Sequence, residues 1–140
     1  MSLESLLIPN QFNVFANSLN STYVLTTTLS GNGGNLSITP APGAGSGATA
    51  SIVGDNLAGQ ITINTGTEVQ AGAVMATIDM TENIPTFVVL MTPNSANAFV
   101  PTYGTAQTAD NQWTISTFGG DVFSASTTYI FNYLIVGYST

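Results

Sequence analysis

The stretch from residue 58 to 92 constrains the fold more than any other part of the chain, because its apolar and polar residues alternate with a period of two. The alternation covers residues 60–64 and 74–80, and a continuous apolar run follows over 87–91. Successive side chains of a strand point to opposite faces, so alternation predicts strands that are buried on one side. The continuous run predicts a strand that is covered on both sides.

The longest strand is expected over residues 127–136, TTYIFNYLIV. Tyr129, Phe131 and Tyr133 share one face with Ile135, while Leu134 and Val136 lie on the other, so this strand is also expected to be covered twice. Further strands are expected at 22–29, 36–39, 50–53, 98–103 and 112–117. Turn residues recur about every 8–12 residues without helical periodicity, which predicts an all-β protein, an antiparallel, jelly-roll-like β-sandwich with an N-terminal extended arm and hairpin.

Three parts of the chain are distinguished by composition. Residues 1–39 are expected to form an arm and a β-hairpin for attachment or assembly, with the turn at Asn32-Gly33. Residues 40–49, PAPGAGSGAT, are rich in Pro, Ala and Gly and predict a flexible linker. Residues 50–140 are expected to form the sandwich.

The arm is apolar for so short a segment. It either lies on its own sandwich or docks on a neighbouring subunit or another protein, and the second interpretation gives a set of candidate anchor residues. These are Leu3, Leu6, Leu7, Phe12 and Phe15.

The chain of 140 residues contains no Lys, Arg or His, and its seven acidic residues give a net charge of -7. Phosphate groups therefore cannot be neutralised, which argues against nucleic acid or an anionic membrane as a partner. No cysteine is present, so disulfides and thiolate sites are excluded. No apolar run approaches the roughly 20 residues of a membrane helix, and residues 1–20 lack the pattern of a secretory signal.

Catalysis is not expected from this composition. Without His and Cys the commonest general base, the usual transition-metal ligands and the familiar triads are missing, and no cofactor is predicted. The carboxylates of Asp79 and Glu82, or of Asp110 and Asp121, could pair, but their places at strand ends and loops favour solvated charges.

Aromatic residues are the remaining candidates for recognition. Tyr103 and Trp113 could form a platform for a sugar, although packing in the core or at a subunit interface is the commoner role of such residues. The candidates for an oligomer interface or a recognition surface are Tyr103, Trp113, Tyr129, Phe131 and Tyr133.

Four segments in order resemble a β-sandwich module of structural proteins from tailed bacteriophages. They are GDNLAGQITINTGT at 54–67, AGAVMATIDM at 71–80, PTFVVLMTPNSANA at 85–98 and SASTTYIFNYLIVG at 124–137. The resemblance covers about sixty per cent of the chain and none of residues 1–49. It implies a non-enzymatic role on the virion surface, commonly as a trimer, in tail fibres, head fibres or capsid decoration. Such a protein is assembled in the host cytoplasm.

Within that family a capsid cement or decoration protein is the favoured function, because the sequence contains neither a repetitive shaft nor a large baseplate-anchoring region. It would stabilise the head as a homo-oligomer on the major capsid protein. One alternative is a tail-fibre or tail-tip receptor-binding protein, which would contact a host-surface glycan. Another is an extracellular filament subunit or a carbohydrate-binding module.

Acidification provides a first test of the charge argument. All side-chain charges are negative and repel one another, so lowering the pH from 7 to about 4.5 is expected to raise the free energy of unfolding, by less than about 1 kcal/mol. Urea unfolding at the two pH values measures this change. A lower stability at the acidic pH would contradict the argument.

Overall fold

The computed structural model describes residues 35–99 and 101–138. The strand expected at 22–29, its hairpin turn and the candidate anchor residues Leu3, Leu6, Leu7, Phe12 and Phe15 lie outside these ranges.

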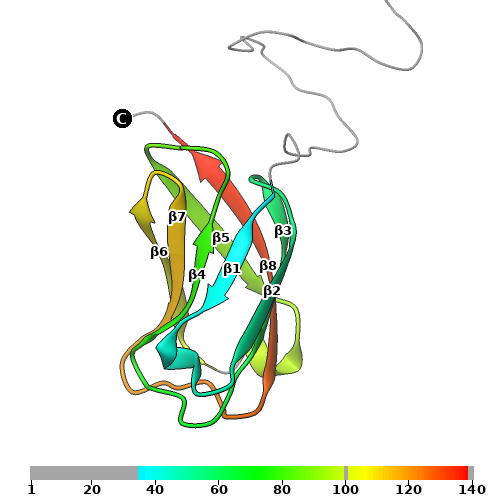
Figure 1. The fold of residues 1–140 in the computed structure, drawn as a ribbon, viewed down its shortest axis with the longest axis vertical. Coiled ribbons are helices and arrows are strands. Elements are labelled where there is room, and N and C mark those ends of the chain that lie inside the picture. The colour runs from blue at the N-terminus through cyan, green and yellow to red at the C-terminus, as the bar shows by residue number, and fades with distance from the viewer. Residues whose placement is uncertain (1–34, 100, 139–140) are drawn as a thin grey trace, which may run out of the picture.

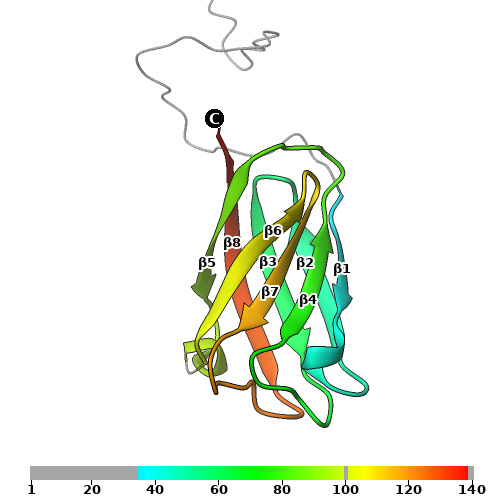
Figure 2. The ribbon, with the colours of Figure 1, turned by 90° about the vertical axis from the view of Figure 1, so that its left-hand side faces the viewer.

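Two four-stranded sheets pack face to face, and the predicted antiparallel β-sandwich is confirmed (Figures 1 and 2). The first sheet has the order β1-β4-β7-β6, formed by Ser37–Pro40, Val74–Asp79, Gln112–Thr117 and Tyr103–Ala109. The second has the order β2-β3-β8-β5, formed by Thr49–Gly54, Ala58–Asn64, Thr128–Gly137 and Phe87–Pro93. Two 3-10 helices, η2 (Pro42–Ala44) and η3 (Ala96–Phe99), lie in the connections.

The core lies between the inner faces that the alternation predicts. In β8 the inward residues Tyr129, Phe131, Tyr133 and Ile135 are all buried. From the opposite sheet Trp113 packs against them, and its ring centroid is 6.0 Å from that of Tyr133. Aromatic burial on both sheets therefore fixes which face of each strand points inward.

The expected linker at residues 40–49 is instead part of the sandwich. β1 pairs with β4 in antiparallel register from Ser37↔Asp79 to Pro40↔Ala76. After it, Ala44 is completely buried and accepts a hydrogen bond from the amide of Gly66, while Ser46 and Thr67 form a β-bridge. The expected linker boundary was wrong because the glycine and proline residues of this segment allow it to pack closely against the turn at residues 66–67, rather than making it flexible.

One strand prediction was also misplaced. The segment 98–103 was expected to be a strand, but η3 occupies Ala96–Phe99 and β6 begins only at Tyr103. Pro101 lacks the N–H that a ladder requires. β6 itself, YGTAQTA, consists of small and polar residues whose alternation gives no signal.

Several segments far apart in the sequence meet at one end of the sandwich (Figure 2). The β2–β3 turn, the end of β8 and the start of β5 lie there, with Phe87 paired to Gly137. The start of β1 lies at the same end, in the other sheet (Figure 1).

Gly59 tests the packing at this end. A Cβ there would lie 2.6 Å from the Tyr133 hydroxyl oxygen and would also clash with the Val53 carbonyl, whereas a Cβ at Gly120 would meet nothing within 4 Å. Gly59→Ala is expected to lower the free energy of unfolding by about 1–3 kcal/mol because the strands must separate, and Gly120→Ala should lower it by less. Equal effects in urea unfolding would contradict the described contact.

Candidate interaction surface

The aromatic residues proposed from the sequence for surface recognition do not form a surface. Trp113 and Phe131 have no exposed area, and Tyr129 and Tyr133 are only 3% exposed. Tyr103 is half-buried, with its ring edge-on to Phe131 at 4.8 Å between centroids. The hypothesis of a sugar-binding platform on Tyr103 and Trp113 is therefore wrong. Because side chains alternate along the strands, these rings point toward the core.

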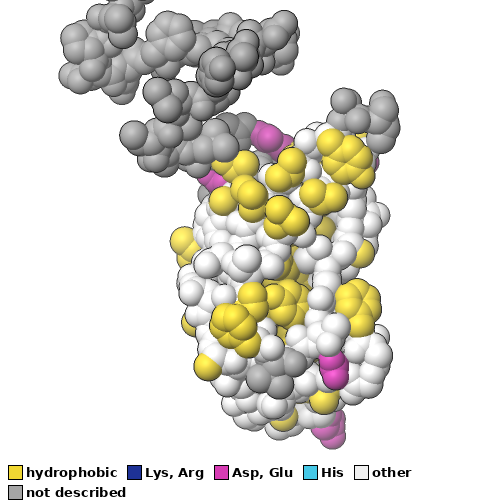
Figure 3. Space-filling model, turned by 180° about the vertical axis from the view of Figure 1, so that it is seen from behind, with side chains coloured by type: hydrophobic (Ala, Val, Ile, Leu, Met, Phe, Trp, Pro, Cys, Tyr) yellow, Lys and Arg dark blue, Asp and Glu magenta, His cyan; other side chains and the backbone are white. Residues whose placement is uncertain are grey.

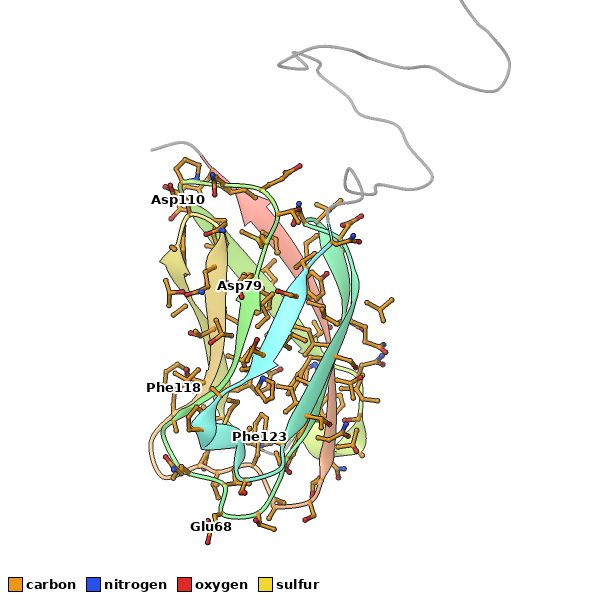
Figure 4. All side chains as sticks on the ribbon, viewed as in Figure 1. Glu68, Asp79, Asp110, Phe118 and Phe123 are labelled. Carbon is orange, nitrogen blue, oxygen red and sulfur yellow. The ribbon has the colours of Figure 1, made fainter. Side chains whose placement is uncertain are left out.

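The carboxylates are spread over the described residues rather than gathered. Asp110 lies at the β6–β7 turn and Asp121 follows β7 at the other end, so this pair cannot meet; Figure 4 likewise places Asp110 and Glu68 at opposite ends of the sandwich. Asp79 accepts a hydrogen bond from the Gln112 side chain at 2.8 Å. Asp121 accepts one from the Thr102 amide at 3.0 Å, and this hydrogen bonding lowers the pKa of Asp121. No group of acidic residues in the described ranges is suited to hold a metal ion.

The outer face of the β2-β3-β8-β5 sheet carries no charged side chain on its four strands, and its two ends differ in polarity. Toward one end Asn132 accepts hydrogen bonds from the side-chain amides of Gln60 and Asn94, each at 3.3 Å. Further along, Asn64 accepts from the Thr128 hydroxyl at 2.7 Å and donates to the Thr49 hydroxyl at 3.1 Å. These neutral side chains satisfy one another across neighbouring strands.

The other end of this face is apolar. Val88 pairs with Val136 and Leu90 with Leu134 across β5 and β8; Figure 3 shows hydrophobic side chains gathered in its upper part and a second group in its lower half. The exposed fractions of the four paired residues run from 38% for Leu134 to 57% for Leu90. We call this set the apolar patch: Val88, Leu90, Leu134 and Val136.

The apolar patch corrects the expectation that β5 and β8 are covered on both sides. Their inner faces are covered by the opposite sheet, but the described residues place nothing over Leu90 or Val136. The sequence correctly indicated that both faces of these strands are apolar. The expectation that both faces are buried within the fold was wrong.

Part of the edge of β5 is occupied by side chains of β6. The Phe87 amide donates to the Gln107 side chain at 3.1 Å, and the Thr105 hydroxyl donates to the Val89 carbonyl at 3.1 Å. Two of the main-chain groups through which a further strand would pair are therefore already bonded. Contacts at this end of the sandwich are expected to run through side chains.

The turn beside the apolar patch is held from within. The Tyr133 hydroxyl donates to the Asp55 carbonyl oxygen at 2.8 Å, and the Asp55 carboxylate accepts from the amides of Leu57 and Ala58. Gly54 has a φ of 140°, which only glycine adopts readily. Burial, aided by the nearby charge of Asp55, raises the pKa of Tyr133 to about 12.

Comparisons with protein-family models, curated proteins and solved structures found no match to this chain. In the described parts of the chain, no helix has the length and apolarity needed to cross a membrane.

Tyr133→Phe is expected to change the response to alkali. The neutral phenol stabilises the fold fully below pH 10, and this stabilisation is lost as the pH rises through the folded-state pKa of about 12. No Lys or Arg is present, so tyrosines are the only side chains that titrate in this window. The variant should be about 1 kcal/mol less stable at pH 7 because one hydrogen bond is lost.

Between pH 10 and 12 the free energy of unfolding, measured with urea, should fall by about 2 kcal/mol less in the variant than in the unmodified protein. The same alkaline loss in both proteins would show that Tyr133 is not the group responsible.

Proposed function

We propose that this chain is a non-catalytic structural subunit of a bacteriophage virion, a cement or decoration protein that stabilises the capsid as an oligomer. The observation that carries the proposal is the apolar patch on an uncharged face of a rigid sandwich. The resemblance of residues 54–137 to phage structural modules supports the virion context.

The chemistry of the face suits permanent protein contact. The largest exposed apolar patch of a single chain is often functional, and the cores of interfaces are depleted in charge. The inner face beneath the patch is part of the core, since Tyr133 and Ile135, which flank Leu134 in β8, are both buried. A partner can therefore bind without a change in the backbone.

The net charge of -7 suits a contact of this kind. Copies of the chain repel one another at long range, so stable assembly requires short-range apolar burial. A shell protein that presents Lys or Arg would attract the chain electrostatically, while the apolar patch remains available for contact between copies. The major capsid protein is the partner in this proposal.

Binding to capsids tests the function. Full-length protein is added to capsids that lack it, and the bound copies per particle and the temperature of capsid disassembly are measured. Binding of hundreds of copies and a higher disassembly temperature are expected. A handful of copies per particle, or adsorption to host cells without capsid binding, would contradict the proposal.

A matched pair of variants links the test to the patch. Val88→Thr with Val136→Thr places two hydroxyls on the patch, whereas Val74→Thr with Val122→Thr makes the same change at residues of similar exposure, 39% and 44%, away from it. The first pair is expected to weaken capsid binding at least about tenfold through lost apolar burial. The second pair should bind like the unmodified protein, and equal binding by both pairs would exclude the patch as the contact.

A further inference from the structure

The size of the apolar patch limits what can cover it. Its four partly exposed side chains offer much less apolar surface than the roughly 800 Å² that a stable dimer buries on each partner. The remainder of the face is polar and already hydrogen-bonded through Asn132 and Asn64. A short apolar segment therefore fits the patch better than a second sheet laid over the whole face.

The chain itself contains such a segment outside the described residues. Seven of the thirteen residues in 3–15 are Leu, Ile, Val or Phe, and only Glu4 is charged. Pro9 lacks the amide hydrogen needed in a ladder, which matches a contact made through side chains on a face rather than at the partly occupied edge of β5.

The length of the chain before the described fold allows a segment to be exchanged between copies. The described fold begins just before β1, at the same end of the sandwich as the patch but in the opposite sheet. Residues 16–35 can span at most roughly 66 Å when extended, which is enough to reach the patch of the same chain or that of another copy. The oligomer proposed above favours the patch of another copy.

We infer that the apolar patch is the binding site for residues 3–15 of a second copy of this chain. The inference rests on the proposed function, because it names the contact by which the subunits of the decorating oligomer hold one another. Each copy gives one segment and receives one, and a head-to-tail contact of this type closes into a ring when the rotation permits. The expected trimer would be one such ring.

Spin labelling tests the contact in the full-length chain. The protein contains no cysteine, so Ser5→Cys provides a single site for a nitroxide inside the segment. Copies that carry the nitroxide are mixed with copies that carry no nitroxide but have isotope-labelled Leu and Val methyl groups. The methyl signals of Val88, Leu90 and Leu134 in the copies without nitroxide are expected to be lost, while that of Val122 at the other end remains.

Two variants of the receiving copy complete the design. With Val88→Thr and Val136→Thr the Leu90 signal should return, and with Val74→Thr and Val122→Thr it should stay lost. The inference is overturned if signals vanish only when nitroxide and isotope share one chain, if none vanish, or if all vanish alike. If the protein binds capsids but the methyl signals of the patch persist, the proposed function stands and only this contact is refuted. If the methyl signals are lost but the protein does not bind capsids, the contact stands and the proposed function is refuted.

Discussion

The two-sided apolar character of β8 is the constraint on which the described structure depends. Its inward side chains meet the opposite sheet, where Phe131 contacts Tyr103 and Tyr133 contacts Trp113. In its own sheet β3 pairs with residues 128–134 and β5 with residues 131–137, so the two neighbours together cover its whole length. Because side chains alternate strictly, burying the aromatic residues commits Leu134 and Val136 to the outer face. The apolar patch is thus a direct consequence of how the core is built.

The lack of cationic side chains determines how polar groups are satisfied. Carboxylates bond to main-chain amides, as Asp55 does to Leu57 and Asp121 to Thr102, or to a neutral side chain, as Asp79 does to Gln112. These contacts fix turns and strand ends but supply no long-range attraction between elements. Cohesion between the sheets therefore comes mainly from apolar burial, supplemented by the hydrogen bonds between β5 and β6, and apolar burial is also available for binding another subunit.

The sequence predicted the fold wherever apolar residues alternate, and it failed where small or turn-forming residues carry the packing. β3, β4 and β8 were recognised from their periodicity, whereas β6 has too few large side chains to produce one. Residues 40–49 were interpreted as a linker because composition does not reveal that Ala44 is buried. The sugar platform on Tyr103 and Trp113 was wrong, whereas core packing, the commoner role considered for these residues, is what the structure shows for Trp113.

Sedimentation velocity of the full-length chain over a wide concentration range tests the central claim that another copy covers the outer face of β5 and β8. The account predicts that the unmodified protein associates into a small closed oligomer. It also predicts that replacing Val88 and Val136 with threonine leaves a folded monomer at the same concentrations. An unmodified protein that stays monomeric throughout, or a variant that associates equally well, would contradict it.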